Sequence, residues 1–214
     1  MAQARSYMAH PKRMARILDF LETIDQLKTI YRAAYLADGS RHESDAEHTW
    51  HTCLFALLLF HETDLDLDIG HALELILIHD LVEIYAGDTY VHLTEDRIAA
   101  QAREEAAAKR LFALLPKDLA KQMQEWWTEF EHGQTAEARF ARAMDRLQGF
   151  TQNIFAGGRV WQERGVTEEM TRAVNKDAID LHATLGEVYE ALYERASKDH
   201  LWLVSDGPSD ESGP

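Results

Sequence analysis

The chain has 214 residues, a length that suits one domain. Its formal net charge of −15 disfavours binding to nucleic-acid backbones, although a bound cation and a few arginines would still attract a small anion. A single cysteine, Cys53, excludes an intramolecular disulfide and fits a reducing compartment. The longest apolar run, residues 53–60, is too short to span a membrane, and residues 1–16 contain no apolar signal core. We therefore expect a cytoplasmic protein.

Helix-breaking residues are scarce, with 4 prolines and 11 glycines, and this favours long helices over many short strands. Apolar residues between 14 and 27 recur at steps of three and four, which predicts an amphipathic helix before a turn at 38–40. Ser44 and Glu47 have the spacing of a capping box. This pair predicts a second helix that carries His48 in its first turn.

A third helix is expected from about Asp68 to Gly87, apolar on nearly all sides and therefore central. Further helices are expected at 94–115, 117–131, 135–155 and 168–196. No stretch of alternating polarity predicts a strand. The sequence thus predicts an all-α fold, a single-domain irregular helical bundle over residues 1–204, followed by a disordered tail at 205–214.

The unusual feature is the pair His79 and Asp80, which lies within the apolar stretch Leu-Ile-Leu-Ile-His-Asp-Leu-Val. Burial of two ionisable groups costs several kcal/mol unless they are paired or bind a cation. Asp145 shares a predicted helix face with core residues, and His48 adds an imidazole near a helix start. Each residue alone is more often a hydrogen-bonded core group or a cap, but the joint pattern favours a metal site. Two imidazoles and two carboxylates suit manganese, cobalt, iron, nickel or zinc better than calcium.

At these residues the chain resembles the HD-domain metal-dependent phosphohydrolases, whose signature is H…HD…D. It is most similar to the YfbR-like 5′-deoxynucleotidase branch of that superfamily. Residues 43–50 resemble its E-S-x-x-E-H-[ST] motif, residues 79–89 its H-D-x-x-E-x-x-x-G-D motif, and residues 127–138 its W-x-E-[FY]-E…T-x-E-A stretch. The similarity extends from about Leu27 to Leu147. It implies an HD-type helical bundle.

The resemblance also implies roles for the matching residues. One divalent cation would be held by His48, His79, Asp80 and Asp145. Glu83 and Asp88 would lie beside the phosphate as catalytic groups, activating water or protonating the leaving oxygen, or else would only orient the metal ligands. Arg32 would contact the phosphate, and Thr89 is a further candidate for binding substrate. His51 is a weaker candidate for a metal contact, because it matches no family ligand.

The expected reaction is hydrolysis of a (deoxy)nucleoside 5′-monophosphate to nucleoside and phosphate. Deoxy-specific members carry a tryptophan soon after the arginine, whereas residues 33–35 here are Ala-Ala-Tyr. This departure keeps open a related enzyme that acts on nucleoside di- or triphosphates or another small phosphate ester. A non-catalytic binding module stabilised by a structural metal is the third alternative. The resemblance implies a homodimer, for which Trp126, Trp127 and the last predicted helix offer surface, and neither a nucleic-acid polymer nor a membrane is expected as a partner.

Overall fold

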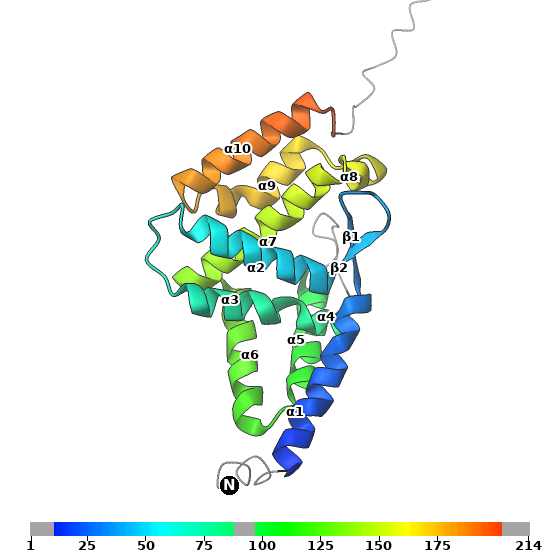
Figure 1. The fold of residues 1–214 in the computed structure, drawn as a ribbon, viewed down its shortest axis with the longest axis vertical. Helices are drawn as coiled ribbons and strands as arrows, with labels where there is room; N and C mark the ends of the chain where they lie inside the picture. Colours follow the sequence, from blue (N-terminus) through cyan, green and yellow to red (C-terminus); the bar gives the residue numbers. More distant parts are fainter. Residues whose placement is uncertain (1–10, 88–96, 203–214) are drawn as a thin grey trace, which may run out of the picture.

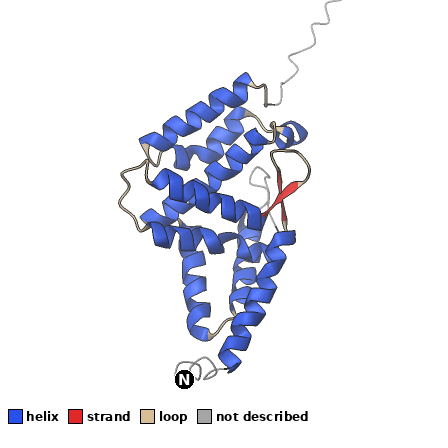
Figure 2. Cartoon of the chain, in the orientation of Figure 1, coloured by secondary structure: helices blue, strands red, loops and turns tan. Residues whose placement is uncertain are grey.

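The computed structural model describes residues 11–87 and 97–202, which are helical apart from one short hairpin (Figures 1 and 2). The α-helices are α1 (Pro11–Ile24), α2 (Asp45–Phe60), α3 (Ile69–Ile78), α4 (Glu83–Ala86), α5 (Arg97–Phe112), α6 (Lys117–His132), α7 (Ala136–Phe155), α8 (Arg159–Arg164), α9 (Glu168–Ile179) and α10 (Ala183–Lys198). The remaining elements are the 3₁₀ segments η2 (Asp25–Thr29) and η3 (His79–Val82) and the strands β1 (Tyr31–Tyr35) and β2 (His42–Ser44). The predicted all-α class is confirmed, while the predicted tail and residue 94 lie outside the described residues.

Local capping signals place several helix ends where the sequence predicts them. Ser44 and Glu47 form the expected capping box at the start of α2. The Asp68 side chain caps α3, and the Thr135 side chain accepts the capping hydrogen bond of α7. Gly133 follows α6 in the left-handed conformation that ends a helix at low cost. These ends depend only on neighbouring residues, so the sequence is sufficient to place them.

The prediction of no strand was wrong, because residues 31–44 form an antiparallel hairpin. Tyr31 pairs with Ser44 and Tyr35 with His42, with an irregular register between them. The Tyr35 and His42 rings stack with their centroids 4.1 Å apart, and the Arg159 guanidinium lies 3.9 Å above the Tyr35 ring. The Arg159 contact comes from a distant part of the chain, so the residues of β1 alone do not indicate a strand.

The predicted third helix is interrupted before Gly87. α3 ends at Ile78, and the chain continues as η3 and then the short α4. The His79 ring donates its Nδ1 hydrogen to the Ile76 carbonyl oxygen at 2.6 Å. In a continuous α-helix that carbonyl would accept from the Asp80 amide. We attribute the change in helix type to this side-chain competition, which places the His-Asp pair in a tighter 3₁₀ turn.

The single long helix expected at 168–196 is two helices, α9 and α10. His182 caps the second of them, because its Nδ1 accepts from the Thr184 amide at 3.1 Å. The Nε2 hydrogen of the same ring is donated to Asp64 Oδ1 at 2.7 Å. The break contains neither glycine nor proline, so the usual helix-breaking residues do not reveal it. The short helix α8 was likewise not predicted.

Two hydrophobic clusters support the fold. The first packs α2, α3, α9 and α10 around α7, which contributes the fully buried Phe140, Met144 and Leu147. The second joins α1, α5, α6 and η3 at the other end of the molecule (Figure 1). Trp127 is 4% exposed within this second cluster, so it offers no surface to a partner chain. Within the described residues, no helix combines the length and apolar character needed to cross a bilayer.

Candidate active site

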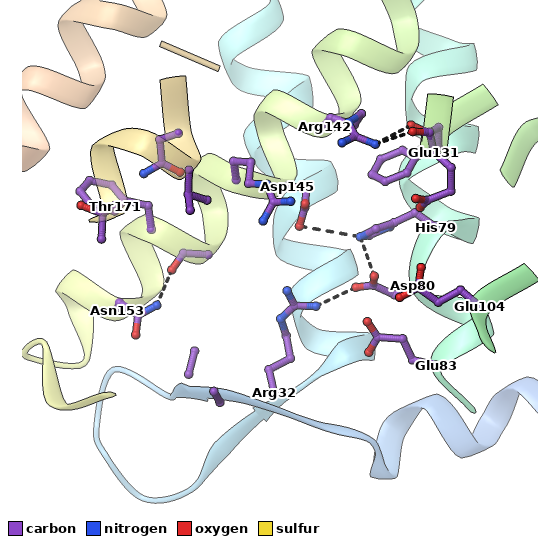
Figure 3. A pocket seen from close by; sticks show the side chains of 18 of the residues that line it. Arg32, His79, Asp80, Glu83, Glu104, Glu131, Arg142, Asp145, Asn153 and Thr171 are labelled. Carbon is purple, nitrogen blue, oxygen red and sulfur yellow. Dashed lines mark hydrogen bonds and ion pairs between the residues drawn. The ribbon is translucent and has the colours of Figure 1, made fainter. Parts of the chain in front are cut away.

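Three separate elements bring the predicted metal ligands together. His48 comes from the first turn of α2, His79 and Asp80 from η3, and Asp145 from the middle of α7. One ligand atom each from His48, His79 and Asp145 lies within 4.8 Å of the others. Asp80 completes the group, with Oδ1 at 3.0 Å from His79 Nε2 and Oδ2 at 3.7 Å from His48 Nε2. Figure 3 shows His79, Asp80 and Asp145 pointing toward one another.

Both imidazoles present Nε2 to this cluster. His48 donates its Nδ1 hydrogen to Gln148 Oε1 at 2.5 Å, and His79 donates its Nδ1 hydrogen to a backbone carbonyl. These bonds orient Nε2 of each ring toward the carboxylates, and His48 Nε2 lies 3.0 Å from Asp145 Oδ1. On losing its Nε2 proton, each ring would present the Nε2 lone pair to a metal. His79 Nε2 is buried and has no hydrogen-bond partner among the described residues, although Asp80 Oδ1 lies 3.0 Å and Asp145 Oδ1 3.8 Å away. A cation between these atoms would satisfy both the nitrogen and the carboxylates.

The electrostatics of the cluster also favour a bound cation. Burial opposes the charged form of His79, but the Asp80 and Asp145 carboxylates outweigh it and raise the pKa of His79 to about 10. Burial would raise the pKa of Asp80, but His79 and Arg32 instead lower that pKa to about 2. The pKa of Asp145 is likewise held well below its usual value, against burial, by the two histidines. Buried carboxylates that hold positive charge this strongly suit a divalent ion, so the residues present fit the metal.

Gln148 holds the outer side of His48 in place. It is fully buried one helical turn after Asp145, on the same face of α7. Its Nε2 donates to Glu43 Oε1 at 2.9 Å and to His51 Nδ1 at 3.2 Å. His51 therefore belongs to this outer network rather than to the ligand cluster. The sequence analysis did not identify Gln148, although its three-residue spacing from Asp145 was an available signal.

Arg32 and Glu83 lie on the other side of the cluster. Arg32 donates to Asp80 Oδ2 at 2.8 Å and to Asp45 Oδ1 at 3.5 Å. Burial, the Asp80 charge and a hydrogen bond with Asp45 raise the pKa of Glu83 well above its usual value. The Glu83 carboxyl group therefore favours its protonated form more than a free glutamate does, and it lies close to Arg32 (Figure 3). Asp45 was not singled out from the sequence, and the predicted Asp88 and Thr89 lie outside the described residues.

A cavity of about 300 Å³ opens onto these groups, which is the size of a small-molecule site. Arg32, His79, Asp80, Glu83 and Asp145 line one part of it. The rest extends along α7 and past β1 toward α9 (Figure 3). The structure thus combines a candidate cation site, an arginine, a carboxyl group with a raised pKa and space for an organic substituent. This combination defines a helical metal-dependent phosphohydrolase.

Comparison with known proteins agrees with this class. The sequence model of the HD domain matches residues 24–185, and the chain belongs to the HD-domain family. It is 32% identical to the bovine (Bos taurus) 5′-deoxynucleotidase HDDC2 over 154 residues, which cover 71% of this chain and 74% of that protein. It is 31% identical to the human (Homo sapiens) 5′-deoxynucleotidase HDDC2 over 137 residues, covering 64% of this chain and 66% of the human protein.

Solved structures share the fold. A predicted metal-dependent phosphohydrolase from Magnetospirillum magnetotacticum superposes with a TM-score of 0.82 at 40% identity, covering 90% of this chain and 99% of that one. A conserved hypothetical protein from Pyrococcus furiosus superposes with a TM-score of 0.62 at 22% identity, covering 83% of this chain and 99% of that one. The second likeness concerns the fold alone. Together they show that the fold of this chain occurs in solved structures.

Proposed function

We propose that the chain hydrolyses (deoxy)nucleoside 5′-monophosphates to nucleoside and phosphate. The reaction would use one divalent transition-metal ion (manganese, cobalt, iron, nickel or zinc) held by His48, His79, Asp80 and Asp145. The observation that carries the proposal is the convergence of two imidazole Nε2 atoms and two carboxylates, of which His79, Asp80 and Asp145 line an open cavity. The 5′-deoxynucleotidase names of the mammalian relatives support the choice of substrate.

The bound cation would polarise the phosphoryl group and lower the pKa of an attacking water. Arg32 lies within the cavity beside Asp80, so its guanidinium can turn toward a phosphate oxygen and offset the charge of that group. Glu83 is partly buried and its pKa is raised, so in its protonated form it can donate a proton to the leaving 5′-oxygen as the phosphorus–oxygen bond breaks. Asp88 and Thr89 remain candidates from the family motif for the activation of water and for substrate contact.

The test is phosphate release from a panel of nucleoside mono-, di- and triphosphates, with metal analysis of the same protein sample. We expect hydrolysis of deoxynucleoside monophosphates, loss of turnover with a chelator, and loss of turnover in a folded Asp145→Ala variant. Hydrolysis of triphosphates alone would refute the proposed substrate in favour of the related enzyme. A folded, metal-loaded protein that releases no phosphate from any compound would support the non-catalytic binding module instead.

We also propose that the chain is cytoplasmic and that it forms a homodimer, as the family resemblance implies. Large apolar side chains on α2 and α3 support a second copy as the partner, because they are exposed although the rest of these helices packs in the core; they are Trp50, Leu54, Leu57, Leu58 and Leu77. The partly buried free thiol of Cys53 is compatible with a reducing compartment. Light scattering of the purified protein and of a Leu58→Lys variant would test the dimer, and a monomeric unmodified protein would refute it.

A further inference from the structure

The cavity continues beyond the metal cluster along one face of α7. Asp145, Gly149 and Asn153 all line it, and their four-residue spacing places them on one side of the helix, about 6 Å apart along its axis. Ala33 and Ala34 of β1 line the same cavity. A phosphate ester held at Asp145 therefore has room for its organic part over Gly149 and toward Asn153.

Gly149 has no structural reason to be a glycine. It lies in the interior of α7, where glycine is less favourable than alanine. It is not among the residues with positive φ, so its backbone does not require glycine. A methyl group built on Gly149 would meet no atom within 4 Å, so packing does not require it either. The absent side chain leaves open space above the helix, and this space is part of the cavity.

Asn153 provides a second, independent indication of a ligand. Its side chain lines the cavity at 9% exposure, and its Nδ2 is fixed by donating to the Gly149 carbonyl oxygen at 2.8 Å. Its Oδ1 is buried and has no hydrogen-bond partner among the described residues. A buried acceptor without a donor is unfavourable in the free protein, and a donor on a bound molecule would remove that penalty. Thr171 of α9 lines the cavity as a further polar group.

We propose that Gly149 and Asn153, facing Ala33, Ala34 and Thr171, form the nucleoside subsite of the enzyme. This inference rests on the proposed function and adds to it the place of the organic part of the substrate. Gly149 would allow the sugar and base to lie close against α7. Asn153 would accept a hydrogen bond from a hydroxyl or N–H group of that nucleoside. Both positions would then favour binding at the expense of helix stability.

Substitutions at Gly149 give opposite effects on stability and binding. Gly149→Ala should raise the melting temperature by about 2 °C, because alanine favours the helix. It should also weaken inhibition by a free deoxynucleoside, and Gly149→Leu should weaken it further, by about 10-fold or more. The KM for the deoxynucleoside monophosphate should rise in parallel. Inhibition by inorganic phosphate, which occupies only the metal end, should change less than about twofold.

Two further variants distinguish a loss of nucleoside binding from a non-specific effect of substitution on the fold. Gly186→Ala is the matched control, because Gly186 is a glycine of α10 outside the cavity lining, where a methyl group would make an ordinary contact of 3.5 Å. It should leave the KM and both inhibition constants unchanged. Asn153→Leu removes the unpaired acceptor at similar volume, so it should keep the melting temperature and weaken deoxynucleoside binding several-fold.

The results distinguish this inference from the proposed function. If the unmodified enzyme hydrolyses deoxynucleoside monophosphates but the Gly149→Leu and Asn153→Leu variants keep its KM and its deoxynucleoside inhibition constant, the nucleoside subsite is refuted and the activity stands. If no monophosphate is hydrolysed, calorimetric titration with the free deoxynucleoside still decides the inference. Binding that Gly149→Leu abolishes would support the subsite without the activity, and binding that both variants retain would refute it.

Discussion

Replacement of Gln148 by methionine tests whether the orientation of His48 controls metal binding. Methionine has nearly the shape of glutamine but neither accepts the His48 Nδ1 hydrogen nor donates to Glu43. Without that acceptor, the neutral His48 ring is no longer held with its Nε2 lone pair toward the cluster. Gln148 is fully buried, so water does not replace the lost partner.

The expected loss is large enough to measure. Removal of a group that orients a metal-bound histidine typically weakens metal affinity by about 10- to 100-fold, which corresponds to about 1.4–2.8 kcal/mol of binding free energy. The buried Nδ1 hydrogen of His48 is left without an acceptor, which costs a further ~1–3 kcal/mol of folding stability. Affinity for the cation and stability of the metal-free protein should therefore both fall in Gln148→Met.

A matched control lies one helical turn away. Gln152 is also buried on α7, but its Nε2 donates to the Tyr35 carbonyl oxygen at 2.7 Å and not to a metal ligand. Gln152→Met should lower the free energy of unfolding by about 1 kcal/mol and leave metal affinity unchanged. Competition with a fluorescent chelator measures the affinity, and urea unfolding of the metal-free proteins measures the stability. Equal metal affinities of the Gln148 and Gln152 variants would refute the orienting role of Gln148.

Three other substitutions test the remaining groups. Glu83→Gln should lower kcat by about 100-fold or more with little change in KM, because glutamine cannot supply the proton for the leaving oxygen. Steady-state phosphate release measures both constants, and an unchanged kcat would limit Glu83 to a structural role. Arg32→Met should raise the inhibition constant of inorganic phosphate by about 10-fold, since a charged hydrogen bond is lost. The Arg41 hydrogen bond, against burial, lowers the pKa of Glu47 to about 2 from 4.5, so Glu47 stabilises the fold above pH 4.5 and loses this effect as the pH falls toward 2. Glu47→Gln should therefore lower the free energy of unfolding, measured with urea at pH 7, by about 1 kcal/mol or less, because solvent partly screens the Arg41–Glu47 pair. The difference in unfolding free energy between the variant and the unmodified protein should be smaller at pH 3. A difference that stays the same at both pH values would contradict the lowered pKa of Glu47.

The sequence was sufficient for those features that neighbouring residues determine. The helix starts after Ser44, Asp68 and Thr135 follow from short polar side chains that cap their own helices. The convergence of His48 with Asp145, 97 positions apart, was expected from the order of the family motifs rather than from periodicity. Their role as metal ligands remains a prediction, as do the roles of Glu83 and Arg32.

Features set by distant contacts were missed. Arg159 packs over Tyr35 of the hairpin, and Asp64 accepts a hydrogen bond from His182 at the start of α10. Neither contact can be predicted from the neighbouring residues, because both join segments that are far apart in the sequence. Gln148 was missed for a related reason. Its role depends on its contact with His48, which lies 100 positions away in the sequence.

The position of the candidate metal cluster between the two hydrophobic clusters has a mechanical consequence. His48 and Asp145 belong to helices of the α7 cluster, whereas Asp80 sits on η3, which packs with α1, α5 and α6 (Figure 1). A cation coordinated by His48 and Asp145 on one side and by Asp80 on the other would link the two hydrophobic clusters directly. Such a cation would stabilise the contact between the two clusters as well as assist the chemistry, because it binds only where ligands from both clusters converge.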